Sequence, residues 1–165
     1  MHHMVPFDPA DWASRGFGSF VAIRRLPRPE PPQLPVARGV YVVLLSSPGR
    51  PGFRAASGGG HWKGKDPTVP QARLEREWVE QTATLYIGRA TSLRERVGEL
   101  LRFSDGLPVR HWGGRLLWQL EGCQDFLLGW RESPDFVSLE ADLIDNFVEH
   151  FRRLPFANLM CGNRR

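Results

Sequence analysis

The chain has 165 residues and a net charge of +4, and this length fits one globular domain with a single core. No stretch reaches the roughly 18 apolar residues that a membrane-spanning helix needs, and charged residues interrupt positions 1–30, where a secretory signal needs an apolar run. Two cysteines, Cys123 and Cys161, are too few for a disulfide scaffold, so we expect free thiols in a cytoplasmic protein. The net positive charge permits a polyanionic partner, but it fits a solvated basic surface equally well.

The first half of the chain contains one clear strand between two irregular regions. Residues 1–35 are predicted to be an N-terminal extension, and the prolines at 27–35 favour a linker or clamp across the surface. Residues 36–45 are rich in β-branched and aromatic side chains, which predicts a buried strand. The glycine- and proline-rich stretch that follows predicts a long flexible loop, and a short helix is expected at 71–80.

The second half contains two further strands and three helices. In chain order we expect a strand at 84–88, a helix from about 92 to 103, a helix at 108–120 weakened by two glycines, a strand at 125–132 and a helix at 136–154 ended by a proline. These elements predict an α+β domain in which helices pack on a three-stranded sheet.

Two charged residues interrupt apolar helix faces. Glu140 comes four residues after Phe136 and three before Leu143, so it lies on the apolar stripe that faces the sheet. A carboxylate there must either pair with an internal arginine or bind a metal ion. Arg96 flanks the inward stripe of its own helix, where it either pairs with an acid or points toward a phosphate.

The only two tyrosines lie beside glycine in predicted strands, in Gly39-Val40-Tyr41 and Tyr86-Ile87-Gly88. These segments resemble the two signature tripeptides of the GIY-YIG nuclease superfamily, and the resemblance extends over roughly residues 36–160. The family continues with a basic residue, a helix with a leucine and an arginine, a helix with a metal-binding glutamate, and then a proline and an asparagine. The matching positions are Arg89, Leu93, Arg96, Glu140, Pro155 and Asn158.

The chain also departs from the family pattern. A short hairpin usually joins the two signature strands, whereas 44 residues separate Tyr41 from Tyr86 here, so the resemblance implies an insertion at about 46–82. Residues 1–35 have no counterpart. The segments 111–115 and 155–158 suggest a distinct bacterial subfamily.

The resemblance implies a small antiparallel sheet and a nuclease that uses one Mg²⁺ or Mn²⁺ ion. Glu140 would bind this ion together with water, since Mg²⁺ accepts few protein ligands. Arg96 would neutralise the scissile phosphate, and Arg89 would act as a second cation.

Four further residues carry expected roles. Tyr41 resembles the general base of the family, which requires its phenol pKa to fall under the influence of metal and arginines. Tyr86 would orient water or phosphate, and Asn158 would hold the geometry through hydrogen bonds. His111 is either a further catalytic residue or an ordinary surface or capping histidine.

Contacts to nucleic acid are expected from arginine-rich faces and from the insertion, through Trp62, Lys63 and Lys65. A zinc site is disfavoured because the cysteines and histidines lack paired zinc-ligand spacing.

Two functions follow from these patterns. The first is a metal-dependent endonuclease that hydrolyses phosphodiester bonds in DNA, with RNA not separated from DNA and with a protein partner that could supply specificity. The alternative is a non-catalytic nucleic-acid-binding or interaction module that retains the fold.

Overall fold

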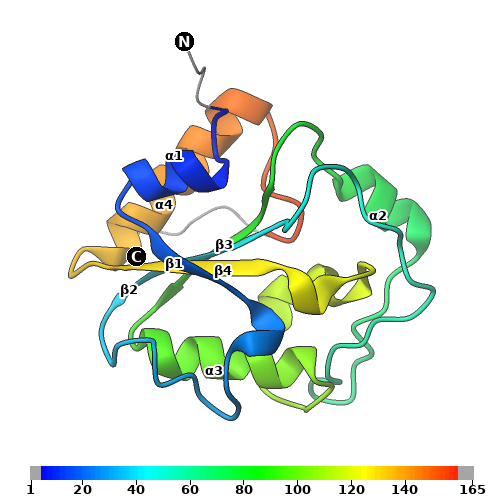
Figure 1. Ribbon diagram of the computed structural model, residues 1–165. Coiled ribbons are helices and arrows are strands. Elements are labelled where there is room, and N and C mark those ends of the chain that lie inside the picture. Colours follow the sequence, from blue (N-terminus) through cyan, green and yellow to red (C-terminus); the bar gives the residue numbers. More distant parts are fainter. Residues whose placement is uncertain (1–4, 160–165) are drawn as a thin grey trace.

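The computed structural model describes residues 5–159, and its centre is an antiparallel sheet with the strand order β1-β4-β2-β3 (Figure 1). The strands are β1 (Gly18–Ala22), β2 (Gly39–Leu44), β3 (Thr84–Ala90) and β4 (Leu127–Glu132). The predicted α+β class is confirmed. The predicted number of three strands is wrong, because the sheet has four.

The additional strand, β1, comes from the segment predicted to be an extension. It pairs with β4 through Gly18↔Trp130 and Ala22↔Leu127, and the register shifts between Gly18 and Val21. Ser19 has a φ of 57° inside this strand. A strand of five residues with an irregularity and no fully buried residue lacks the apolar pattern by which strands are recognised in a sequence.

Helices cover both faces of the sheet, with α1 and α4 on one side and α3 on the other (Figure 1). The α-helices are α1 (Pro9–Ser14), α2 (Gln71–Glu77), α3 (Leu93–Ser104) and α4 (Phe136–Phe151), and the 3₁₀ segments are Ile23–Arg25, Trp112–Gln119 and Cys123–Asp125.

Two helical predictions need correction. The segment expected to be a helix at 108–120 is a 3₁₀ segment with a kink at Gly114, whose φ and ψ are not helical. The last helix ends at Phe151 rather than 154, because Arg152 takes a left-handed conformation with φ 63° and closes it. Pro155 therefore follows the helix end instead of causing it.

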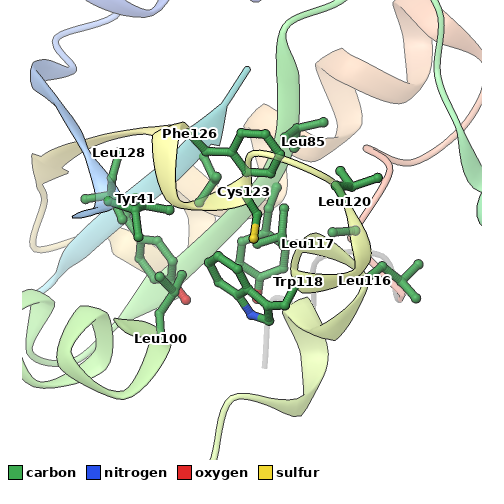
Figure 2. Close-up of a cluster of buried hydrophobic side chains, with 14 of the residues drawn as sticks. Tyr41, Leu85, Leu100, Leu116, Leu117, Trp118, Leu120, Cys123, Phe126 and Leu128 are labelled. Atoms are coloured by element: carbon green, nitrogen blue, oxygen red, sulfur yellow. The ribbon is translucent and has the colours of Figure 1, made fainter. Parts of the chain in front are cut away.

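The alternating side chains of β2 divide the protein into two cores. Val40, Val42 and Leu44 belong to the cluster on the α1 and α4 side. Tyr41 and Val43 belong to the cluster on the α3 side, where Tyr41 lies near Leu100 (Figure 2). All six residues of β2 are buried, as expected for a central strand covered on both faces.

Residues before β2 are part of this packing. Trp12 Nε1 donates to Thr84 Oγ1 at 2.9 Å, and that hydroxyl donates to the Phe7 carbonyl at 2.7 Å. Phe7 and Trp12 lie in the same cluster as α4. The proline-rich segment crosses α3, where Arg94 donates to the Leu34 carbonyl at 2.8 Å.

The insertion is attached to the domain through Gln119, a fully buried residue of the 3₁₀ segment. Its amide nitrogen donates to the carbonyls of Arg54 and Val69, at 3.0 and 2.8 Å. Its amide oxygen accepts from Val69 N at 2.9 Å. Gln119 therefore joins the segment to the core through specific buried hydrogen bonds, and the flexibility of the glycine-rich stretch stays a prediction.

Within residues 5–159, no helix has both the length and the apolar character needed to cross a membrane. Cys123 is a buried free cysteine. Cys161 lies outside the described residues.

Candidate functional site

The candidate site surrounds one end of the edge strand β3. A solvent-open pocket of about 310 Å³ lies there between β3, α3 and the beginning of α4. Its lining residues are Arg89, Ala90, Thr91, Ser92, Glu95, Arg96, Glu99, Arg110 and Phe136.

Two tyrosines and a histidine pack together beside this end of the sheet. The Tyr41 hydroxyl lies 2.8 Å from His111 Nε2, and both side chains are fully buried. The ring of Tyr86 lies 6.0 Å from that of Tyr41 and 5.8 Å from that of His111, measured between centroids. The alternative of a surface or capping histidine is wrong, because the imidazole is buried and makes no capping hydrogen bond.

Packing explains why positions 39 and 88 are glycine. A Cβ on Gly88 would lie 2.5 Å from Tyr41 Cζ and 2.8 Å from Tyr86 Cε1. A Cβ on Gly39 would lie 2.3 Å from the Arg131 carbonyl oxygen. Larger residues would therefore displace the rings or separate β2 from β4.

The surroundings keep these rings neutral. Burial raises the pKa of Tyr41 well above its usual value, although the charge of Arg96 opposes this effect. Burial also raises the pKa of Tyr86, again with Arg96 opposing. Burial, followed by the charge of Arg96, lowers the pKa of His111 to about 3. The expected fall in the Tyr41 pKa is therefore not seen in the protein alone, where desolvation outweighs the arginine.

Glu140 faces the sheet from α4, as its place on the apolar stripe predicts, and only 9% of the residue is exposed. Its Oε1 lies 3.7 Å from Arg89 Nη1. Burial raises the pKa of Glu140, while the charge of Arg89 and a hydrogen bond from the Arg89 backbone lower it. The ordinary alternative for this residue, an ion pair with an internal arginine, is thus present in the structure.

Arg96 extends from α3 into the pocket. Its Nη1 donates to Glu99 Oε2 at 2.5 Å and also to the Arg110 carbonyl. The expected alternative of pairing with an acid is present, with Glu99 as the acid, whereas the Arg110 carbonyl was not expected. The three-residue spacing of Arg96 and Glu99 was the available signal for the first, whereas nothing in the sequence connects Arg110 with Arg96.

Asn158 closes the edge of β3 rather than lining the pocket. Its side-chain oxygen accepts from Ile87 N and its side-chain nitrogen donates to Ile87 O, both at 2.9 Å. The neighbouring Ala157 N donates to Leu85 O at 2.9 Å. The role of holding the geometry through hydrogen bonds fits these contacts.

The lysines of the insertion lie elsewhere. Trp62 and Lys65 form a two-residue bridge around a tight turn in which Lys63 has a φ of 51°. This turn follows Gly60, whose N–H bonds to the Phe103 carbonyl near the end of α3. Neither Lys63 nor Lys65 lines the pocket, so the structure does not bring these residues together with Arg96.

Glu140 lies beside Arg89 and is not among the residues that line the pocket, and its single carboxylate suits a hydrated magnesium or manganese ion better than zinc. No cluster of three or more histidine, cysteine or acidic side chains able to hold a metal occurs among residues 5–159. Zinc generally needs three or four such ligands. Mg²⁺ commonly binds through one or two carboxylates and keeps several waters, a requirement that Glu140 can meet.

Comparisons of the chain with protein-family models, with curated proteins and with solved structures found no match.

Proposed function

We propose that the protein is a metal-dependent endonuclease that hydrolyses phosphodiester bonds in DNA. The observation that carries this proposal is a solvent-open pocket lined by Arg89 and Arg96 at the end of β3, with Glu140 beside Arg89 and the two signature tyrosines packed nearby. An anionic substrate needs such cations, and a phosphodiester in addition needs a group that can carry a metal ion.

Arg96 and Arg89 would bind the non-bridging oxygens of the scissile phosphate. A guanidinium can donate two parallel hydrogen bonds to such a group. Glu99 and the Arg110 carbonyl already restrict the guanidinium of Arg96, so part of the entropy of ordering this side chain is lost before substrate binds.

Glu140 would hold the metal ion through one carboxylate. A bound Mg²⁺ or Mn²⁺ supplies charge neutralisation at the phosphate and stabilises the departing oxygen. Glu140 must be ionised for this role. Because burial raises its pKa, acid should weaken metal binding more than it would for an exposed glutamate.

Tyr41 is the candidate base, and His111 fixes the direction of its hydroxyl through the 2.8 Å contact. The charge of Arg96 already lowers the pKa of Tyr41, although burial outweighs it. Further positive charge bound at Glu140 would act in the same direction.

Cleavage of supercoiled plasmid DNA tests the proposal. The purified protein should cut in the presence of Mg²⁺ or Mn²⁺, and chelation should abolish cutting until the ion is restored. Glu140→Gln should reduce the rate by about 100-fold or more, the scale seen when a charge-stabilising group is removed from a reacting centre. The matched control is Glu149→Gln, an exposed position on the same helix, which should leave the rate unchanged. Equal cutting by Glu140→Gln would refute the proposed role.

The Arg89–Glu140 ion pair favours one alternative, a non-catalytic nucleic-acid-binding module. In that case the protein would bind DNA with strong salt dependence and cut no form of it. The same assays with RNA substrates decide between the two nucleic acids.

A further inference from the structure

The pocket at the end of β3 contains a third arginine whose side chain takes no part in the chemistry described above. Arg110 lines this pocket together with Arg89 and Arg96. It lies in the connection between α3 and the 3₁₀ segment Trp112–Gln119. Its backbone carbonyl accepts a hydrogen bond from Arg96 Nη1, so the residue already touches the site through its main chain.

The backbone of Arg110 is held in place on both sides. Its carbonyl is bound by Arg96. The next residue, His111, is fully buried with its Nε2 2.8 Å from the Tyr41 hydroxyl, and its backbone N–H donates to the Val109 carbonyl at 2.9 Å. Contacts that do not involve the Arg110 side chain therefore fix its position relative to Arg96 and Tyr41.

The residue itself is exposed. An arginine carries its guanidinium on a long stem of three methylene groups, and the charged end stays in water while the stem lies along the protein. Since the pocket is open to solvent and the Arg110 backbone is anchored at its wall, the guanidinium can reach an anion that enters the pocket.

Arg110 also differs from the other two arginines of the pocket in its charge balance. Arg96 is paired with Glu99, and Arg89 lies 3.7 Å from Glu140. Among residues 5–159, no ion pair involves Arg110. An arginine without a carboxylate contributes its full charge to the attraction of a polyanion and exchanges no partner when it binds one.

The remaining acid of the pocket is Glu95. It lies in the first turn of α3, where the positive end of the helix dipole offsets part of its charge. Glu95 therefore weakens the field of Arg110 less than an acid elsewhere in the pocket would.

We propose that the side chain of Arg110 is a further substrate-binding residue, which binds a backbone phosphate of the DNA at the candidate active site. The inference deepens the proposed function and rests on it, because it needs nucleic acid in this pocket. A guanidinium binds two phosphate oxygens at once. Because Arg110 has no contact with Glu140 in the described protein, its contact with phosphate forms with or without a metal ion. It should thus contribute to affinity for substrate more than to the rate of the chemical step.

The first test is the salt dependence of binding to a short DNA duplex, measured with a chelator present so that no cutting occurs. Arg110→Ala keeps the backbone carbonyl that holds Arg96 and removes only the guanidinium. The loss of one phosphate contact should reduce the slope of log K against log salt by about 1, which corresponds to about 8-fold weaker binding at 0.1 M salt. Arg110→Lys retains the charge and should keep the slope of the wild type.

The matched control is Arg25→Ala. Arg25 is likewise exposed, forms no ion pair among the described residues and does not line the pocket. This variant removes the same charge from the protein, so it should keep the slope and the affinity of the wild type if the contact at Arg110 is local.

Cleavage kinetics give the second test. In the presence of Mg²⁺ or Mn²⁺, Arg110→Ala should raise KM by about the factor by which it weakens binding and change kcat much less. If Arg110→Ala does not fold, as judged by circular dichroism, Arg110→Gln takes its place in both tests.

The outcomes separate this inference from the proposed function. A wild-type slope and KM in Arg110→Ala, in a protein that cuts DNA, would overturn the role of Arg110 and leave the nuclease standing. An equal slope change in Arg25→Ala, a loss of kcat without a change in KM, or a slope change with an RNA duplex alone would also overturn it. A slope change specific to Arg110, in a protein that binds DNA but cuts none, would support the contact and refute the nuclease. Absence of DNA binding would overturn both.

Discussion

At the scale of single residues, the contact between Tyr41 and His111 determines what the buried rings can do. The hydroxyl and Nε2 lie 2.8 Å apart. Nδ1 is buried without a hydrogen-bond partner in the described protein. A protonated imidazole would leave its Nδ1 N–H unpaired and place a charge in this apolar setting, beside the charge of Arg96. His111 is therefore held neutral.

This neutrality predicts acid sensitivity. The pKa of His111 is about 3 in the folded protein, against an ordinary value of 6.5. Below pH 6.5 the unfolded chain takes up a proton that the folded chain does not bind until about pH 3. The free energy of unfolding should thus fall as pH decreases through this window, by at most about 1.4 kcal/mol per pH unit.

Urea unfolding at several pH values measures this contribution as a difference between variants. His111→Gln should have a shallower dependence than the wild type, because its side chain does not titrate. His61→Gln alters an exposed histidine and should keep the wild-type slope. Identical slopes for the wild type and His111→Gln would show that His111 is protonated equally in both states.

At the scale of elements, β3 is an edge strand whose backbone is satisfied by the end of the chain. Leu85 accepts from Ala157, Ile87 bonds twice to Asn158, and the Arg89 backbone bonds to Glu140. An unpaired edge would expose a row of polar groups to other chains. The same contacts hold α4 and the Glu140 carboxylate against β3. The hydrogen bonds that cover the edge of β3 therefore also position Glu140 beside Arg89.

Asn158→Leu tests how much the hydrogen bonds between Asn158 and Ile87 stabilise the edge of β3. The substitution leaves the N–H and C=O of Ile87 without partners, which should reduce the free energy of unfolding by about 2–4 kcal/mol. Hydrogen exchange at the Ile87 amide should accelerate more than exchange in β2. Asn146→Leu, at an exposed position of α4, is the control and should change neither quantity. Unchanged protection of Ile87 in Asn158→Leu would contradict this account.

At the scale of the whole molecule, the sequence predicted the elements that carry a strong local pattern. The apolar run of β2 and the stripes of α3 and α4 were sufficient to locate those elements and to turn Glu140 toward the sheet. β1 was missed because its pairing with β4 depends on tertiary contact and on an irregular register.

In the candidate site, too, contacts that form only in the folded protein could not be predicted from the sequence. Motif spacing singled out Tyr41, Tyr86, Arg96 and Glu140 as candidates, and of these four Arg96 alone lines the pocket. The neighbours of Arg96, Arg110 and Glu99, emerge only from the folded geometry. Lys63 and Lys65 carry the right charge for nucleic acid, but the path of the insertion places them away from the pocket. Positive charge in a loop of the sequence is compatible with binding nucleic acid, but it does not show where the loop lies in the folded protein.

The insertion should unfold together with the rest of the domain, because the buried amide of Gln119 joins them. Gln119→Leu removes partners from the Arg54 carbonyl and from both backbone groups of Val69. The expected loss is about 2–5 kcal/mol in the free energy of unfolding, with faster hydrogen exchange at the Val69 amide. Gln71→Leu changes an exposed glutamine of α2 within the insertion and should have little effect.

In the wild type, probes in the insertion and in the sheet should report one denaturation midpoint. A separate, earlier transition of the insertion, unaffected by Gln119→Leu, would show that this segment is an independent unit and that its hydrogen bonds to the core do not stabilise the domain.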